Sequence, residues 1–200
     1  MVAFVSQSAP DFTASAVLGS GQISSFHFSK KTEGQYKVLF FYPLDFTFVC
    51  PSELIALEKR AKAFEERNTA VVAVSVDSQH THAAWRRTPI DQGGIGPVSY
   101  PLVSDLKHEI CRAYGVEHPE AGVSLRGAFI IDQGMKIRSA IINDLPIGRN
   151  IDEILRTIDA LQFHEKHGQV CPAGWQEGRP GMQGSHEGVS QYLKEHEGQL

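Results

Sequence analysis

Cys50 stands where an apolar strand gives way to a helix, and this position suits a reactive thiol. The strand is the apolar run Val38–Tyr42, and the helix is predicted to begin at Pro51, whose missing N–H would have no partner in a first helical position. A thiol at that end feels unpaired backbone N–H groups and the positive end of the helix dipole. Both favour the thiolate, which is the nucleophilic form of cysteine. The sequence therefore predicts sulfur chemistry at Cys50.

The two other cysteines, Cys111 and Cys171, bear on what happens to an oxidised sulfur. Three cysteines are too few for a disulfide scaffold, and no two form a Cys-x-x-Cys pair. Disulfides in a reducing cytosol tend to be transient and catalytic. The sequence separation of 121 between Cys50 and Cys171 does not decide whether a bond would lie within or between chains. Cys111 is predicted to be a packed structural thiol, with contact or oxidation at an assembly interface as the alternative.

Composition excludes several classes of function. The chain has 200 residues, which suits one α/β domain with an appended segment, and its net charge of −4 comes without a basic cluster. These features argue against nucleic acid and anionic membrane as partners. The start of the chain, Met1–Ser6, lacks the pattern of an export signal, and no apolar run is long enough to span a bilayer. We therefore expect a cytoplasmic protein.

The histidines and glycines predict neither a metal nor a cofactor. His80 and His82 are two positions apart, so on a helix they point in different directions. His164 and His167 share a helix face but lack a third ligand at metal spacing. The glycine-rich loops contain no phosphate-binding pattern.

The order of the predicted elements indicates a thioredoxin-like α/β fold, in which helices flank a central mixed β-sheet. A strand, a helix, a strand and a helix are followed by a hairpin and a last helix. The principal segments are a strand at 38–42, a helix continued by Leu54, Leu57, Ala61 and Phe64, a buried strand at 70–76, a helix capped by Asp77-Ser78, a strand at 100–103, a short helix at 105–114, a hairpin around Gln133-Gly134 and a helix to about His167. We expect a thioredoxin-like domain over residues 1–167 and a C-terminal tail over 168–200.

Four segments, in the same order along the chain, resemble the peroxiredoxins. Pro43–Pro51 looks like the motif of their peroxide-attacking cysteine, and Arg126–Asp132 resembles the segment that carries their catalytic arginine. Asp144–Arg149 resembles the loop before their last helix. Val170–Pro172 resembles the resolving-cysteine motif of typical two-cysteine members, which include the alkyl hydroperoxide reductase and thioredoxin peroxidase group. The similarity runs from about residue 9 to residue 175.

The resemblance implies a thiol peroxidase that reduces hydrogen peroxide and organic hydroperoxides in antioxidant defence. Cys50 would attack the O–O bond, giving a sulfenic acid and water or an alcohol. Thr47 would place its hydroxyl beside the sulfur and the peroxide oxygens. Arg126 would favour the thiolate and stabilise charge on the departing oxygen. Pro43 would shield the site from bulk water.

The resemblance also implies supporting residues and partners. Glu53 would pair with Arg149 and hold the start of the helix, although a surface ion pair worth less than about 1 kcal/mol is the plainer interpretation. Cys171 would resolve the sulfenic acid as a disulfide between two subunits of an antiparallel homodimer. Thioredoxin or a dedicated flavoprotein reductase would reopen that bond. Family members also form decamers of five dimers, and a holdase chaperone activity is a second hypothesis.

The glycine loop and the end of the tail have two interpretations. The loop Gly93–Gly96 and the tail pair Tyr192-Leu193 resemble a cover over the active site in members that over-oxidise easily, but leucine replaces the aromatic residue of the tail. A plain surface loop and a frayed tail are the alternative. A thioredoxin-like disulfide reductase is a third hypothesis, which the missing Cys-x-x-Cys pair disfavours.

Overall fold

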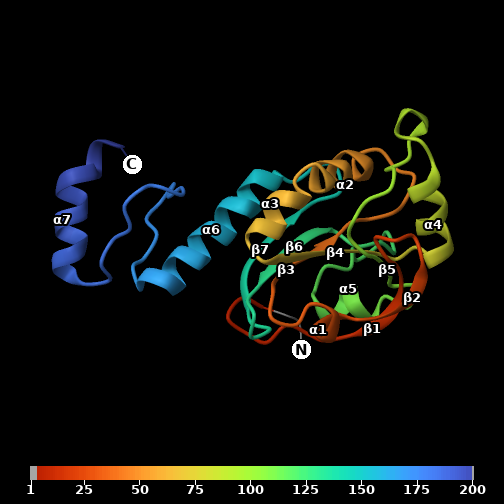
Figure 1. Cartoon of the computed structure of the whole chain (residues 1–200), viewed down its shortest axis with the longest axis horizontal. Coiled ribbons are helices and arrows are strands. Elements are labelled where there is room, and N and C mark those ends of the chain that lie inside the picture. The colour runs from red at the N-terminus through yellow and green to blue at the C-terminus, as the bar shows by residue number, and fades with distance from the viewer. Residues whose placement is uncertain (1–3, 200) are drawn as a thin grey trace. The chain divides into compact units, whose positions relative to one another are not determined.

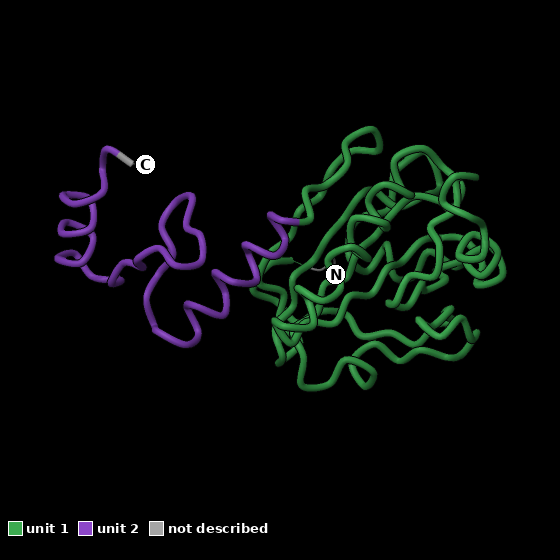
Figure 2. The backbone as a smooth tube through the Cα atoms, turned by 45° about the horizontal axis from the view of Figure 1, so that its top comes forward, with its two compact units in different colours: residues 1–151 green, residues 152–200 purple. Residues whose placement is uncertain are grey.

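The computed structural model describes residues 4–199 of the chain, so Met1–Ala3, part of the segment predicted not to be an export signal, lies outside the described residues. The chain divides into two compact units, Met1–Ile151 and Asp152–Leu200, which Figure 2 draws in different colours. The predicted boundary at residue 167 differs from this division, because the last long helix belongs to the second unit.

The first unit is built on one seven-stranded mixed sheet with the strand order β2-β1-β5-β4-β3-β6-β7. The central strands β3, β4 and β5 run parallel, and β1, β2, β6 and β7 join their neighbours in antiparallel pairs. In Figure 1 the sheet lies between α2 and α3 on one side and α5 on the other. This is the predicted thioredoxin-like arrangement. The elements of the first unit are β1 (Thr13–Val17), β2 (Ile23–His27), α1 (Phe28–Lys31), β3 (Tyr36–Phe41), α2 (Cys50–Glu58), α3 (Ala61–Glu66), β4 (Thr69–Ser75), α4 (Gln79–Arg87), η1 (Ile90–Gln92), β5 (Leu102–Ser104), α5 (Glu109–Ala113), β6 (Arg126–Ile131) and β7 (Ile137–Asn143).

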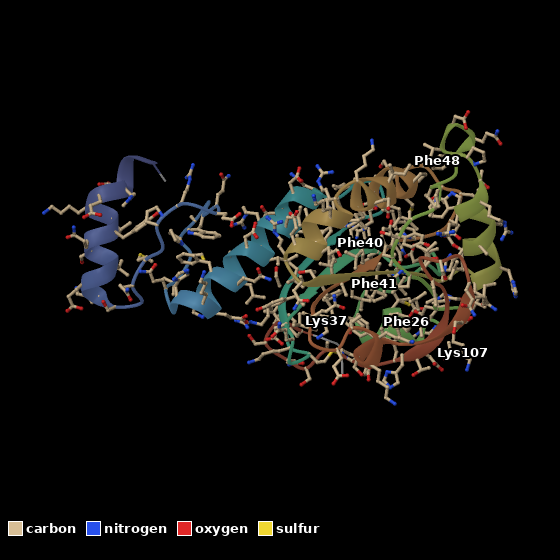
Figure 3. All side chains as sticks on the ribbon, in the orientation of Figure 1. Phe26, Lys37, Phe40, Phe41, Phe48 and Lys107 are labelled. Atoms are coloured by element: carbon tan, nitrogen blue, oxygen red, sulfur yellow. The ribbon has the colours of Figure 1, made fainter. Side chains whose placement is uncertain are left out.

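Strand β3 is buried on both faces because neighbouring strands and covering helices leave neither face to water. Its side chains alternate across the sheet, so Phe40 and Phe41 face opposite layers (Figure 3). Phe41 packs in the core on the α5 side, where its ring meets Tyr114 and Phe129 at centroid distances of 5.4 and 5.8 Å. This packing fixes the strand end from which the loop to Cys50 departs.

The helix predicted from Pro51 through Phe64 is broken in two. Helix α2 ends at Glu58 and α3 begins at Ala61, although the apolar spacing continues across the gap. The backbone N–H of Arg60 bonds to the carbonyl of Leu57, three residues back, which tightens the chain and interrupts the α-helical ladder. Periodicity alone does not reveal such a break because both helices bury the same face.

The start of α4 agrees with the prediction, and the start of α5 does not. Ser78 caps α4 as expected, with its hydroxyl accepting a hydrogen bond from the N–H of Thr81. The predicted helix over 105–114 shortens to α5 because Asp105 stays outside it, and its carboxylate accepts from the N–H groups of Ile110 and Cys111. No helix in residues 4–199 has both the length and the apolar character needed to cross a membrane.

The second unit carries Cys171 between two helices. Helix α6 spans Ile151–His167 and ends where it was predicted to end. Helix α7 spans His186–His196, and Ser185 caps it by accepting a hydrogen bond from the N–H of Gly188. The short helix η2 follows over Glu197–Gln199.

Candidate active site

The thiol of Cys50 lies in the first turn of α2 and is fully buried. The loop that follows β3 delivers it there, and Pro51 takes the second helical position rather than the predicted first one. The carbonyl of Val49 accepts from the N–H groups of Ser52 and Glu53 at 3.1 and 3.3 Å, which closes this turn. The sulfur therefore sits at the positive end of a helix, as the sequence predicts.

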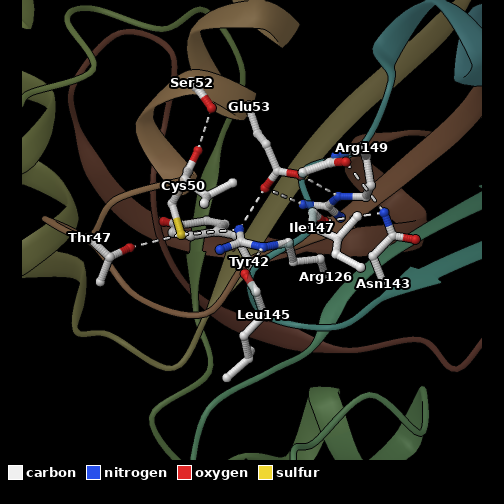
Figure 4. A network of polar contacts seen from close by, with 12 residues as sticks. Tyr42, Thr47, Cys50, Ser52, Glu53, Arg126, Asn143, Leu145, Ile147 and Arg149 are labelled. Carbon is white, nitrogen blue, oxygen red and sulfur yellow. Dashed lines mark hydrogen bonds and ion pairs between the residues drawn. The ribbon is translucent and has the colours of Figure 1, made fainter.

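Two side chains from different elements contact the sulfur of Cys50 (Figure 4). The hydroxyl oxygen of Thr47 lies 2.9 Å from Sγ, and a guanidinium nitrogen of Arg126 lies 3.4 Å from it. Both residues were predicted to be there, and the structure brings them together with the cysteine. The sulfur therefore meets a hydroxyl and a permanent positive charge at contact distance.

Arg126 is held rigidly, so its charge has a fixed direction. It begins β6 in the interior of the sheet, between β3 and β7, and is buried. Its Nε donates to the carbonyl oxygen of Leu145 at 2.6 Å, and the same terminal nitrogen that meets the sulfur donates to Glu53 at 2.8 Å. Preorganised charge in a buried site acts more strongly than it would in solvent.

Glu53 and Arg149 form a buried ion pair behind the sulfur. Two guanidinium nitrogens and the backbone N–H of Arg149 donate to the carboxylate at distances between 2.8 and 3.0 Å. The guanidinium also lies 3.3 Å from the centroid of the Phe40 ring and donates to the carbonyl of Gly127. The pair is buried, so the interpretation as a weak surface ion pair is wrong. Glu53 joins both arginines, which the sequence did not predict.

The pKa of Glu53 reflects this surrounding. Burial alone would raise it, but the hydrogen bonds and charge of Arg149, with the charge of Arg126, outweigh burial and hold the pKa below its usual range. The carboxylate is therefore charged at neutral pH and offsets two buried guanidinium groups.

We expect Glu53→Gln to lower the free energy of unfolding at neutral pH by about 3–5 kcal/mol, because it leaves buried guanidinium groups without their counter-charge. Urea unfolding of the reduced protein measures this. The matched control is Glu153→Gln, which breaks a partly exposed pair with Arg156 and should cost less than about 1 kcal/mol.

The pH dependence of that difference has a definite sign. A carboxylate whose pKa is lowered in the folded state stabilises the fold above its unfolded pKa and loses this effect as pH falls through the folded pKa. The gap between wild type and Glu53→Gln should therefore shrink on acidification. A gap that widens toward acid would contradict the assigned charge.

An apolar pocket of about 610 Å³ opens beside the residues that contact the sulfur. Thr47 and Arg126 line it together with Pro43, which is buried as its predicted shielding role requires. Phe48, labelled in Figure 3, lies at its rim with 98% of its surface exposed. A pocket of this size and lining suits a small molecule with an apolar part and a polar end that reaches the hydroxyl and the guanidinium.

Cys111 lies apart from this site and is buried. Burial first, and then the nearby Asp105 carboxylate, raise the pKa of its thiol to about 12. It therefore stays protonated, as the prediction of a structural thiol requires.

Within residues 4–199, one group of potential metal ligands brings its donor atoms within 4.8 Å of one another: His108, Cys111 and Glu117. The carboxylate of Glu117 already accepts two hydrogen bonds from Arg112, and the Cys111 thiol keeps its proton. A divalent cation would have to displace the Arg112 guanidinium from Glu117 and the proton from Cys111, so this donor set does not fit a metal.

Cys171 belongs to the second unit and is a free, partly buried thiol. Its sulfur donates to the carbonyl of Ala160 at 3.4 Å. Burial raises the pKa of this thiol, and the charge of Arg156 opposes that effect. The segment around it is ordered by a β-bridge between Val170 and Met182.

The glycine loop and the tail each have local partners. The indole N–H of Trp85 donates to the carbonyl of Gly93 at 2.9 Å, which ties the loop to α4. In the tail, the Tyr192 ring stacks on His196 within α7. The cover that these two segments resemble stays a prediction.

Sequence patterns alone did not reveal a buried histidine next to the Cys50 loop. His82 is fully buried, and its ring lies 2.7 Å from the carboxylate of Asp45. The helical spacing of Ala83 and Trp85, which are also buried, could have placed His82 on the inward side of α4.

Comparison with known proteins identifies relatives along nearly the whole chain. The model of the AhpC/TSA family matches residues 5–140, and the model of the C-terminal domain of 1-Cys peroxiredoxin matches residues 160–195. Alkyl hydroperoxide reductase C of Buchnera aphidicola subsp. Schizaphis graminum (strain Sg) is 53% identical over 96% of this chain and 98% of its own length.

Solved structures agree with this relation. The reduced 2-Cys peroxiredoxin of Plasmodium vivax superposes with a TM-score of 0.92 at 48% identity, covering 96% of this chain and 98% of that one. Prx1a of Plasmodium yoelii, whose form modified at the N-terminus makes an artifactual octamer, superposes with a TM-score of 0.77 at 48% identity, covering 87% and 100%.

The sequence and structural similarity agrees with the site, where the buried Cys50 contacts a hydroxyl and a guanidinium. The chain belongs to the AhpC/TSA family and is a typical two-cysteine peroxiredoxin, an antioxidant thiol peroxidase that reduces peroxides.

Proposed function

We propose that Cys50 is the peroxide-attacking residue, that Thr47 and Arg126 assist it, and that Cys171 resolves the product. The observation that carries this proposal is the contact of one sulfur with a hydroxyl at 2.9 Å and a guanidinium at 3.4 Å, next to an apolar pocket. Hydrogen peroxide and alkyl hydroperoxides fit that pocket, since the peroxide end is polar and an alkyl group can rest on the apolar lining.

The first step forms a bond between sulfur and oxygen and breaks the O–O bond. The thiolate attacks one peroxide oxygen, and the other leaves as hydroxide or alkoxide, which takes up a proton to become water or an alcohol. Arg126 stabilises the negative charge that develops on the leaving oxygen. Thr47 orients the peroxide through its single hydroxyl. The product at Cys50 is a sulfenic acid.

The second step closes a disulfide. The thiol of Cys171 attacks the sulfenic sulfur, water leaves, and a disulfide joins the two sulfurs. A dithiol reductant then reduces this disulfide by thiol–disulfide exchange, is itself oxidised to a disulfide, and restores both thiols. Thioredoxin or a dedicated flavoprotein reductase fits this requirement. The partial exposure of the Cys171 segment supports the role, because the thiol must leave its carbonyl partner to react.

The disulfide is proposed to join two subunits of an antiparallel homodimer. The edge strand β7 supports this, and β6 lies on one side of it. On the other side Ser6 and Gln7 bond to its first residue, Ile137, and no strand of the described chain lies beside the rest. An open edge with an exposed Ile142 offers hydrogen-bonding groups to a second copy. Larger rings, such as a decamer of five dimers, and a cytoplasmic location belong to the same proposal. The holdase activity stays a prediction.

The experiment is to replace Cys171 by serine. We expect Cys171→Ser to react with the first equivalent of peroxide as wild type does, but to lose steady-state turnover with a thioredoxin system and the covalent dimer on a non-reducing gel. Cys111→Ser is the control and should keep both, because the Cys111 thiol stays protonated. A covalent dimer that survives Cys171→Ser but not Cys111→Ser would overturn the assignment.

A further inference from the structure

A second buried polar cluster lies beside the loop that carries Cys50, and the peroxide chemistry described above does not use it. The Asp45 carboxylate accepts a hydrogen bond from the Tyr42 hydroxyl at 2.8 Å and lies 2.7 Å from Nδ1 of His82. Both side chains of the Asp45–His82 pair are completely buried. Taking such a pair out of water is costly, so its presence calls for a role.

The surroundings of His82 dictate where its protons are. Its Nε2 lies 3.2 Å from the carbonyl oxygen of Val103, which can only accept, so Nε2 carries a hydrogen. Burial first, and then the Asp45 charge, hold the pKa of Tyr42 well above its usual range, so the hydroxyl of Tyr42 remains a donor to the carboxylate. At 2.7 Å the contact between Nδ1 and the Asp45 carboxylate is a hydrogen bond, so a proton lies in it; the Tyr42 hydroxyl lies 3.3 Å from the same nitrogen.

The backbone of Asp45 connects this cluster to the sulfur. Its N–H donates to the carboxylate of Asp77 at 2.7 Å. On the other side of the same peptide, the carbonyl of Leu44 accepts from the hydroxyl of Thr47 at 2.8 Å, and that hydroxyl is the one that lies 2.9 Å from the Cys50 sulfur. The Leu44–Asp45 peptide is thus held at both ends.

Thr47 has a single hydroxyl hydrogen and two acceptors within reach, the Leu44 carbonyl and the Cys50 sulfur. The position of the Leu44 carbonyl therefore decides whether the hydroxyl turns its hydrogen or its lone pairs toward the sulfur and the peroxide. A small displacement of a group in this place has a large effect on rate.

We propose that the Asp45–His82 pair, with Asp77, is a positioning element for the peroxide reaction: it orients the Leu44–Asp45 peptide and, through that peptide, the hydroxyl of Thr47 at Cys50. This inference rests on the proposed role of Thr47. The pair does not touch the reacting atoms.

The test is a double-mutant cycle on the second-order rate constant for oxidation of Cys50 by hydrogen peroxide, measured in a single turnover. His82→Gln should lower this constant by about tenfold, since it misplaces the peptide that orients Thr47. Thr47→Val should lower it by about a hundredfold. In the Thr47→Val background, His82→Gln should have almost no further effect, because the group on which it acts is already gone.

His80→Gln is the matched control, since His80 is an exposed residue of the same helix and should leave the constant unchanged. A His82→Gln protein as fast as this control, or a His82→Gln loss as large in the Thr47→Val background as in wild type, would overturn the proposal. A wild-type protein that does not react with peroxide, or a Thr47→Val protein as fast as wild type, would contradict the proposed function. The effect of His82→Gln tests this inference alone.

Two further measurements keep the proposal testable should His82→Gln not fold. Asp45→Asn preserves an acceptor for Tyr42 and supplies a donor to Nδ1 of a neutral His82, so it should react close to the wild-type rate, whereas Asp45→Ala should be as slow as His82→Gln is expected to be. In wild-type protein with labelled histidine, the NMR spectrum should contain one exchange-protected proton in the Nδ1–Asp45 contact at neutral pH. Its absence, or equal rates for the two Asp45 variants, would contradict the proposal.

Discussion

Replacing Cys50 by serine is expected to abolish peroxide reduction, the largest effect of any single substitution in this chain. A serine hydroxyl in the same place keeps the contacts with Thr47 and Arg126 but is a far weaker nucleophile, and it cannot form a sulfenic acid or a disulfide. The measurement is peroxide consumption with a thioredoxin system. Cys111→Ser, which changes another buried cysteine, should retain the wild-type rate.

A Cys50→Ser protein that still consumed peroxide as fast as wild type would place the chemistry elsewhere in the chain. Thermal unfolding of both serine variants controls for loss of structure, since each substitution replaces a buried sulfur.

Arg126→Gln is expected to lower kcat/KM for hydrogen peroxide by between about a hundredfold and a thousandfold, the range found when one preorganised donor is removed from a site that stabilises developing charge. The substitution takes away the positive charge 3.4 Å from the sulfur and the donor that faces the leaving oxygen. Steady-state kinetics with saturating reductant measure it. Arg126→Lys should fall between, because it keeps a charge but loses the planar fork.

Arg138→Gln provides the matched control. Arg138 lies on the neighbouring strand β7 and pairs with Asp132, away from the sulfur, so its loss should leave kcat/KM within a few fold of wild type. Equal effects of the two substitutions would mean that Arg126 acts only through the stability of the sheet.

The site around Cys50 was largely predictable because its signals are local. A strand, a loop and a helix start in consecutive residues fix the position of the thiol, and Thr47 precedes it at the spacing of one turn. Arg126 is 76 residues away along the chain. Only the resemblance to a family placed it at the sulfur, since nothing in its own segment indicates that this strand begins beside Cys50.

The interactions that were missed depend on how distant segments pack. Glu53 was paired with Arg149 alone, yet it also accepts from Arg126, because α2 and the start of β6 converge there. The burial of His82 follows from the packing of α4 beside the Cys50 loop and β5. Spacing rules compare positions within one element, so they predict that His80 and His82 point apart and could not show that the second meets a carboxylate.

The measurement that tests the central claim most directly is mapping of the oxidised sulfur by mass spectrometry in Cys171→Ser protein, treated with one equivalent of peroxide and a reagent that labels sulfenic acids. Without the resolving thiol the first product should accumulate, so the label is expected on Cys50, with Cys111 and the remaining side chains unmodified. A label on Cys111 while Cys50 stays a free thiol would contradict the account.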